Sequence, residues 1–268
     1  MSYSVSDLYF YPIKSLGPIP INSMEVDSFG PFLDRRIMLV DTNGKFITQR
    51  QCPIMSLIKV NLIDKRLQLS LNEDSVELLL PDFSQKTESV SVTVWDDTVS
   101  GQLIVGEASS WLSKKLNQPV RLVYMDQSEF RQVDLTYARP GIQTSFSDGF
   151  PFLLISQASI DFLSEKVGFD LLMQRFRPNI VVTGCKAFEE DTWKKIKIGD
   201  VVFDLVKPCS RCVIPTIDTV TGEKQKEVMQ AMLKYRRKEK GVFVGQNLIH
   251  TGEGVLDTGF TVEVLELF

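Results

Sequence analysis

The segment Cys209-Ser-Arg-Cys212 is the part of this sequence whose residue types and spacing best suit chemistry. A Cys-x-x-Cys pair can bind zinc, cycle between thiols and a disulfide, or pack as two structural cysteines. Zinc needs two further ligands, and the other cysteines and the single histidine stand at no recognisable ligand spacing. A thioredoxin-like motif needs a helix that starts at the second cysteine, and Pro215 opposes one. Two buried structural cysteines remain the alternative to a functional site.

The neighbours of the two cysteines favour a functional site. Arg211 offers a permanent, fork-shaped cation that can stabilise a thiolate and bind a phosphate, and Ser210 adds a hydroxyl donor. A soft thiolate beside an anion-binding arginine is what a metal-bearing cofactor with a phosphate tail requires.

Other polar groups along the chain suit the same anion. Lys14 and Ser15 follow one strand-like segment, Arg35 begins another, and Arg177 precedes a proline that favours a turn or the start of a strand. Taken singly, each of these residues is more simply a surface or turn residue, and Asp148-Gly149 is most simply a turn.

The composition restricts the possible functions. The chain has 268 residues, 43% of them hydrophobic, and its 30 basic against 34 acidic residues give a net charge of −4. This is ordinary globular composition without the basic balance of a nucleic-acid binder. A single histidine, His250, excludes multi-histidine zinc sites, so we expect enzymatic chemistry to come from a cofactor. No apolar run approaches the ~20 residues that span a membrane, and no secretory signal is present, so we expect a cytoplasmic protein.

Five short motifs follow one another along the chain, and this set resembles MOSC-domain proteins, above all the YcbX-like proteins and the mitochondrial amidoxime-reducing components. The similarity runs from about Tyr9 to the C-terminus. The motifs are Tyr11-Pro-Ile-Lys14-Ser15, Asp34-Arg35, Thr48-Gln-Arg50-Gln51, Phe176-Arg177-Pro178-Asn179 and Cys209-Ser-Arg-Cys212.

The resemblance implies a molybdenum cofactor, Mo-molybdopterin, in which a pterin dithiolene carries the metal and ends in a phosphate. It implies that Cys212 is the protein ligand of molybdenum and that Cys209 packs beside it. Asp148 matches an acidic residue beside the family's cofactor pocket and is predicted to relay protons. The residues implied to bind the cofactor are Lys14, Ser15, Arg35, Gly149, Phe150, Arg177, Asn179, Ser210, Arg211 and Cys212.

The implied activity is the reduction of N-hydroxylated compounds, such as hydroxylamines, amidoximes and N-hydroxylated bases. No cysteine follows Cys212, so the iron–sulfur domain of some bacterial relatives has no counterpart here. We therefore expect electrons from a separate protein of the flavodoxin, ferredoxin or flavin reductase type. The alternative is a protein that carries the molybdenum cofactor or handles sulfur without turnover.

These motifs must be positioned by elements that read mostly as strands. Two apolar runs around Asn43-Gly44 predict a hairpin over 37–48, and alternating valines and leucines predict strands over 67–71 and 90–94. An amphipathic helix is predicted over 107–116, followed by a break. A second helix is predicted over 157–167 with Ser156 as its N-cap, and further strands over 150–155, 179–183, 201–206 and 260–267.

The predicted fold class is α+β, mainly β. The resemblance implies a smaller MOSC-type N-terminal β-rich domain over residues 1–118 and a MOSC β-barrel domain over 119–268, with the first strand joining the barrel. Residues 224–240 carry seven basic and two acidic residues, a net +5 in an acidic protein. A solvated helix face is the simpler interpretation, and a docking surface for the acidic electron donor is the sharper one.

Overall fold

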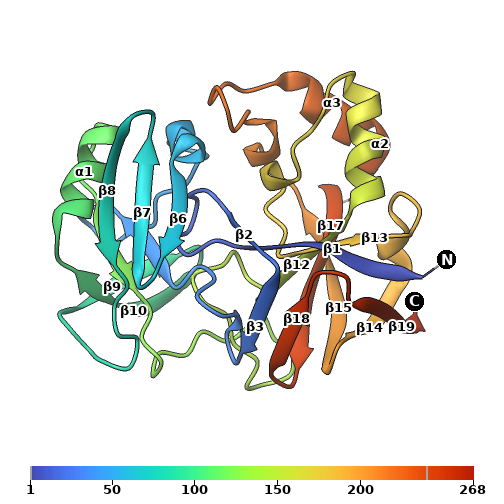
Figure 1. Cartoon of the computed structure of the whole chain (residues 1–268), viewed down its shortest axis with the longest axis horizontal. Helices are drawn as coiled ribbons and strands as arrows, with labels where there is room; N and C mark the ends of the chain where they lie inside the picture. Colours follow the sequence, from blue (N-terminus) through green and yellow to red (C-terminus); the bar gives the residue numbers. More distant parts are fainter. Residues whose placement is uncertain (1, 240) are drawn as a thin grey trace.

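A closed barrel of seven strands forms the right-hand half of the molecule in Figure 1. This computed structural model describes residues 2–239 and 241–268, and it confirms a mainly β fold. The barrel closes because β12 pairs with both β13 and β17. Around the barrel the strands are β12 (Phe152–Ser156), β13 (Ile180–Thr183), β1 (Tyr3–Phe10), β19 (Thr261–Leu267), β14 (Trp193–Ile198), β15 (Val201–Ser210) and β17 (Gly241–Thr251).

The first strand of the chain lies in this C-terminal barrel. β1 is antiparallel to β13, with Val5 opposite Val182, and it also pairs with β19. The barrel interior holds large apolar side chains such as Trp193, Phe152 and Phe203, all at most 1% exposed. Because β1 ends inside this packed barrel, the Lys14 segment that follows it starts from a fixed position.

Two smaller sheets form the N-terminal half. The strand order is β5-β11-β10-β9 in one and β6-β7-β8 in the other, and α1 packs beside them (Figure 1). β11 pairs with β5 and β10, so this sheet continues past residue 118, where the domain boundary is predicted. The elements are β5 (Ile37–Val40), β6 (Lys59–Ile63), β7 (Arg66–Leu71), β8 (Asp74–Leu79), β9 (Ser89–Val94), β10 (Asp97–Ile104), α1 (Glu107–Leu116) and β11 (Arg121–Tyr124).

Short elements complete the structure. A three-stranded sheet has the order β18-β3-β4, β2 extends the pairing of β1, and β16 pairs with β17. The helices α2 and α3 lie side by side at one end of the barrel (Figure 1). These elements are β2 (Ile19–Ile21), β3 (Ser23–Asp27), β4 (Gly30–Pro31), α2 (Gln157–Val167), α3 (Lys226–Arg236), β16 (Arg237–Lys238) and β18 (Gly254–Asp257), with 3-10 turns η1 (Pro53–Leu57), η2 (Met173–Arg175), η3 (Glu189–Thr192) and η4 (Ile214–Thr216).

Local sequence signals account for the helices. The hydroxyl of Ser156 accepts a hydrogen bond from the Ser159 backbone N–H and caps α2, as predicted. α1 ends at Asn117, which adopts the left-handed conformation of a C-cap. The predicted hairpin over 37–48 is only partly right, because its second arm forms no regular strand and contributes one bridge to the first arm, Val40 to Phe46, and another to Thr93 from Lys45.

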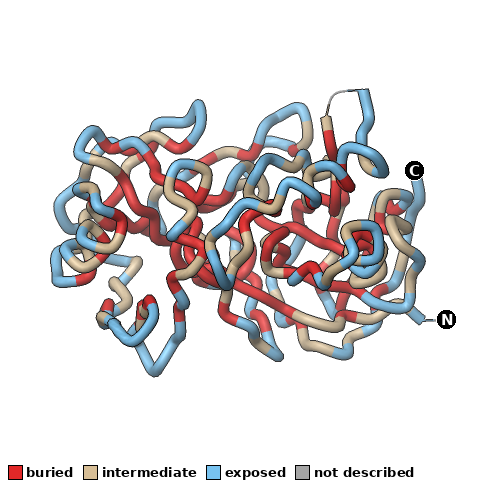
Figure 2. The backbone as a smooth tube through the Cα atoms, turned by 90° about the horizontal axis from the view of Figure 1, so that it is seen from above, coloured by how far each residue is buried: buried red, intermediate tan, exposed pale blue. Residues whose placement is uncertain are grey.

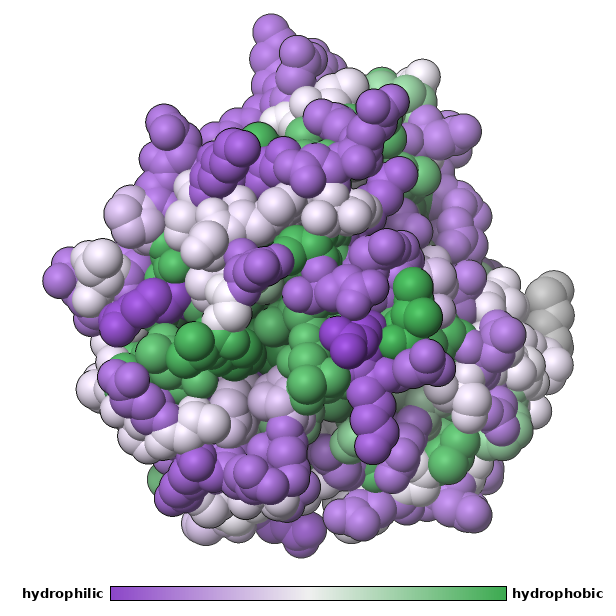
Figure 3. Space-filling model, turned by 60° about the vertical axis from the view of Figure 1, so that its left-hand side comes forward, coloured by the Kyte–Doolittle hydropathy of each residue, from purple (hydrophilic) through white to green (hydrophobic). Residues whose placement is uncertain are grey.

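Buried segments run through the middle of both halves, and exposed residues gather on the outer loops (Figure 2). The face in Figure 3 is mostly hydrophilic, with apolar side chains near its centre. Among the described residues, no helix combines the length and the apolar character needed to cross a membrane. The predicted cytoplasmic location stays a prediction.

Candidate functional site

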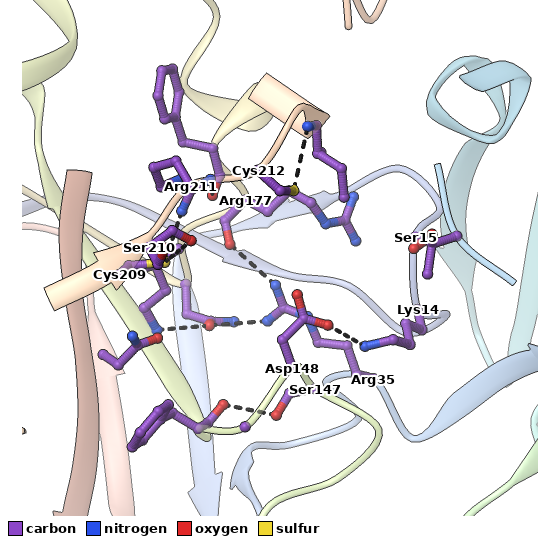
Figure 4. A pocket seen from close by; sticks show the side chains of 18 of the residues that line it. Lys14, Ser15, Arg35, Ser147, Asp148, Arg177, Cys209, Ser210, Arg211 and Cys212 are labelled. Atoms are coloured by element: carbon purple, nitrogen blue, oxygen red, sulfur yellow. Dashed lines mark hydrogen bonds and ion pairs between the residues drawn. The ribbon is translucent and has the colours of Figure 1, made fainter. Parts of the chain in front are cut away.

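One pocket gathers every residue that the sequence analysis predicted to bind the cofactor, together with Asp148 (Figure 4). Its walls come from the segment after β1, the loop before β5, the loop before β12, the turn before β13 and the end of β15. Segments far apart in the sequence therefore meet at one point. The predicted residues that line it are Lys14, Ser15, Arg35, Asp148, Gly149, Phe150, Arg177, Asn179, Ser210, Arg211 and Cys212.

Three of these residues have strained backbones. Ser15, Arg35 and Arg177 adopt positive φ angles of 66°, 48° and 59°. Such conformations cost of order 1 kcal/mol or more for a residue with a side chain, and they tend to cluster at functional sites. The surrounding fold must hold them, and it does so through buried hydrogen bonds.

Arg35 is fixed by a buried polar network. Its Nη1 donates to Asp34 Oδ2 at 2.5 Å and to Asn179 Oδ1 at 3.0 Å, and its Nη2 donates to the carbonyl of Arg177 at 3.1 Å. The Asn179 amide is fully buried and also bonds Leu153 N, Tyr9 O and Asp34 Oδ1. All four of its hydrogen-bonding positions are therefore used. Asn179 positions Arg35, so its predicted role as a direct ligand of the cofactor does not fit this geometry.

Tyr11 brings two of the cations together. The guanidinium groups of Arg35 and Arg177 lie over its ring at 4.3 and 4.2 Å. Burial, and then the charge of Arg35, lower the pKa of Arg177 to about 10. A negative ligand would relieve this concentration of positive charge.

The two cysteines of the motif differ in environment. Cys209 accepts a hydrogen bond from Arg211 Nη1 at 3.0 Å, whereas Cys212 is exposed and receives only the backbone N–H of Ile214 at 3.5 Å. In Figure 4 the sulfur of Cys212 lies above Arg35 and Asp148, in the space between Ser210 and Lys14. Both cysteines line the pocket, and Cys212 has the more exposed thiol.

The alternative roles for the cysteine pair find no support. Within residues 2–239 and 241–268, no group of three or more His, Cys, Asp or Glu side chains is placed to hold a metal ion. The chain after Cys212 forms only the short 3-10 turn η4, where a thioredoxin-like motif would continue as a helix.

Two arginines that line the pocket each have one hydrogen-bond donor that no described group uses. Arg177 Nη2 and Arg211 Nε are buried and have no partner among the described residues. Buried N–H groups are nearly always paired in folded proteins, and an unpaired one costs about 1–3 kcal/mol. Phosphate oxygens would satisfy both groups. The residues present therefore fit a cofactor that combines a phosphate with a thiolate-binding metal.

Lys14 and Asp148 form an ion pair across the pocket, with Nζ 2.5 Å from Oδ1. Lys14 is buried, and desolvation lowers its pKa to about 8 although Asp148 opposes this. Desolvation would raise the pKa of Asp148, but the charge and hydrogen bond of Lys14 outweigh it and hold that pKa well below its usual range. A proton relay must alternate between two protonation states. The carboxylate of Asp148 positions Lys14 through this ion pair, and its predicted relay role stays a prediction.

The remaining predicted residues form the edges of the pocket. Ser210 is exposed at the end of β15, and the ring of Phe150 stacks edge-on against Tyr137. Gly149 has open space around it, because a Cβ there would meet nothing within 4 Å. Close approach of a neighbouring group therefore does not explain a glycine at this position.

The sequence analysis did not place Thr48 and Arg50 among the site residues, yet both line the pocket. The sequence could have indicated both residues, because they belong to the family motif Thr48-Gln-Arg50-Gln51. Trp95 gave no sequence signal at all. It hydrogen-bonds to Asp148 through Nε1 at 3.1 Å, although the two residues are 53 positions apart.

Comparison with known proteins agrees with this arrangement. Residues 2–119 match the MOSC N-terminal beta barrel domain, and residues 142–263 match the MOSC domain. The chain is 30% identical to human mitochondrial amidoxime-reducing component 1, over 98% of this chain and 83% of that protein. The mouse protein of the same name is 32% identical over 87% of this chain and 71% of its own length. Human molybdenum cofactor sulfurase is 31% identical over 92% of this chain but only 30% of its own length.

Both domain matches and the similarity over nearly the whole chain lead to one assignment. The chain belongs to the MOSC-domain family that includes the mitochondrial amidoxime-reducing components.

Proposed function

We propose that this protein is a molybdenum-cofactor-dependent oxidoreductase that reduces N-hydroxylated compounds. Its amidoxime-reducing relatives support this class of reaction. The observation that carries the proposal is the pocket itself, in which the exposed thiol of Cys212 shares one cavity with Arg177 and Arg211 and their unpaired donors.

The residues of the pocket divide into two groups around such a cofactor. Cys212 would bind the metal through its thiolate. Arg177 and Arg211 would bind the phosphate with the nitrogens that now lack partners, and Lys14, Ser15 and Ser210 would donate to the pterin and its phosphate. The remaining predicted residues, Arg35, Gly149 and Phe150, would line the cofactor's pocket. When bound, the cofactor supplies the two-electron chemistry that removes the oxygen from nitrogen.

The protein's own residues fix the geometry of the site. Asn179 and Asp34 hold Arg35, Tyr11 lies against Arg35 and Arg177, and Asp148 holds Lys14. These groups are already paired and mostly buried, so they need little rearrangement when an anion binds.

Electrons are proposed to come from a separate acidic protein of the flavodoxin, ferredoxin or flavin reductase type, in the predicted cytoplasmic setting. The basic segment 224–240 supports this, because α3 packs against η4, which begins two residues after Cys212. Lys240 lies outside the described residues. Within this segment, the exposed cations that make no ion pair among the described residues are Lys224, Lys226, Lys234 and Arg237.

The test combines metal analysis with turnover. Protein produced in a molybdenum-replete host should contain molybdenum near one atom per chain and should reduce a hydroxylamine or an amidoxime with an artificial electron donor. Protein from a host that cannot make the pterin should do neither. Turnover by the metal-free protein would contradict the proposal, as would failure to bind the cofactor in the replete host.

A cofactor carrier or sulfur-handling protein is the second candidate, and its support is the similarity to molybdenum cofactor sulfurase. A carrier would bind the cofactor but leave N-hydroxylated compounds unreduced, and it would pass the cofactor to an acceptor apoenzyme. The same preparation therefore separates the two functions.

A further inference from the structure

An exposed tryptophan lies next to the pocket, where it contacts two of the residues that line it, Asp148 and Arg50. Trp95 is 41% exposed and forms, with Asp96, the two-residue loop that joins β9 to β10. Its Nε1 donates to Asp148, whose side chain is 70% exposed and therefore marks the mouth of the pocket. The N-terminal half thus places a large aromatic ring beside the opening.

The backbone position of this tryptophan is unusual. Trp95 has a φ of 57° at the first residue of a two-residue hairpin loop, where glycine is preferred. A residue with a bulky side chain is strained there, and such strain is a reason to look for a function. The pocket residues Ser15, Arg35 and Arg177 share this feature.

Three contacts hold the indole in place. Besides the hydrogen bond to Asp148, the ring contacts Phe46 at 5.5 Å between centroids, and the guanidinium of Arg50 lies over it at 4.2 Å. Phe46 is buried, so the ring rests on the packed core of the N-terminal half. A ring that is fixed yet exposed is suited to bind a flat partner at low entropic cost.

Arg50 adds a charge to this wall. It lines the pocket, and among the described residues it makes no ion pair. Its Nε only reaches the hydroxyl of Thr48, at 3.4 Å. The other arginines of the pocket have structural partners or face the proposed phosphate site, so Arg50 is the cation left for a second ligand.

We propose that the Arg50–Trp95 stack is the substrate-binding wall of the site. It fits a flat, conjugated N-hydroxylated compound that carries an acidic substituent. The ring of the substrate would stack on the planar groups, and its carboxylate or phosphate would pair with Arg50. This inference rests on the proposed function, which it extends by naming the shape and charge of the preferred substrate.

Three amidoximes test the preference in the molybdenum-loaded protein: 4-carboxybenzamidoxime, benzamidoxime and acetamidoxime. Trp95→Gly suits the positive φ, so the loop should keep its shape. It should raise KM for both aromatic substrates about three- to tenfold and change the KM for acetamidoxime least. Arg50→Gln should raise KM roughly tenfold for the carboxylated substrate and clearly less for benzamidoxime, which has no charge to pair with Arg50. Phe130→Ala removes another exposed aromatic side chain, 51% exposed against 41% for Trp95, away from the residues that line the pocket, and is the control.

A binding measurement separates this inference from the proposed function. The protein has three tryptophans, of which Trp193 is buried and Trp111 is half-buried on α1. The flat anion 4-carboxybenzamide, which has no N–O bond, should change the indole fluorescence, and the change should be lost in Trp95→Gly. The non-planar 4-carboxycyclohexanecarboxamide should bind more weakly.

This titration remains informative even if no amidoxime is reduced, in which case the proposed function fails and the wall is still tested. Equal KM changes for all three amidoximes would overturn the inference, because they would indicate a structural role for Trp95. Equal binding of the flat and the non-planar anion would overturn it as well.

Discussion

Arg211 donates a hydrogen bond to the sulfur of Cys209 at 3.0 Å, and this contact distinguishes the two cysteines of the Cys-Ser-Arg-Cys motif. Cys209 is half-buried and already engaged, while Cys212 is exposed in the pocket. Arg211 therefore binds the sulfur of Cys209 and leaves the thiol of Cys212 free to bind a metal.

Cys212→Ser should abolish both molybdenum binding and turnover, because a hydroxyl is a poor ligand for a soft metal. Cys209→Ser should retain most of the metal and only weaken activity, since a serine oxygen can still accept from Arg211. Metal analysis and turnover measure both effects, and Cys185→Ser, outside the pocket lining, is the control.

Alkylation gives an independent check of the cysteines. In cofactor-free protein, iodoacetamide should modify Cys212 before the three half-buried cysteines, as peptide mass spectrometry would show. Equal loss of activity in both serine variants, with molybdenum retained in both, would refute the assignment of Cys212 as the metal ligand.

Arg177→Gln and Arg211→Gln should each weaken cofactor retention roughly tenfold or more, because each removes a charged donor that lacks a partner in the protein. The readout is the molybdenum content after dialysis. Arg139→Gln, at an exposed arginine outside this pocket, should retain the wild-type content. Unchanged retention in both pocket variants would place the phosphate elsewhere.

Lys14 should make anion binding depend on pH in cofactor-free protein. Its pKa is about 8, so its positive charge is lost as the pH rises through 8, and binding of inorganic pyrophosphate should weaken above that pH. Asp148→Asn removes the carboxylate that raises this pKa, and the midpoint should move to lower pH. Calorimetry would measure pyrophosphate binding between pH 6 and pH 9, a range that brackets the pKa of about 8. Identical midpoints in the wild type and in Asp148→Asn would contradict the prediction.

The effect of Lys14 on stability has the opposite direction. In the unfolded chain its pKa is about 10.4, so between pH ~8 and ~10.4 the unfolded state binds more protons than the folded state. The contribution of Lys14 to the free energy of unfolding therefore rises with pH in this window. Lys14→Met should remove that rise from urea unfolding curves, and a rise that persists in the variant would assign it to another group.

Charge reversal on the basic segment tests the docking of an electron donor, and the structure restricts which residues to use. Arg236 is mostly buried and pairs with Asp191 at 2.5 Å, so it serves the fold. Lys234→Glu with Arg237→Glu, at exposed positions, should slow turnover with an acidic protein donor roughly tenfold at low salt. Turnover with a small dye should be unchanged, and equal losses with both donors would refute docking at this surface.

The sequence alone determined the local elements and indicated residues that the structure brings to one pocket. Ser156 caps a helix and Asn117 ends one because such signals act over three or four residues. The family motifs indicated the residues around the pocket for the same reason, since each motif is a short contiguous run. The second arm of the predicted hairpin is not a regular strand, because it divides its backbone contacts between the first arm and Thr93, which is distant in the sequence.

Only the tertiary structure decided which of those residues have partners. Asn179 is saturated by Tyr9, Asp34, Arg35 and Leu153, and Asp148 is held ionised by a lysine 134 positions away. The indole of Trp95 contacts the pocket residue Asp148 only because a hairpin from the other half of the chain is packed beside it. A side chain's charge state and free hydrogen-bonding capacity depend on burial and on long-range neighbours, and strand pairing across the barrel sets both.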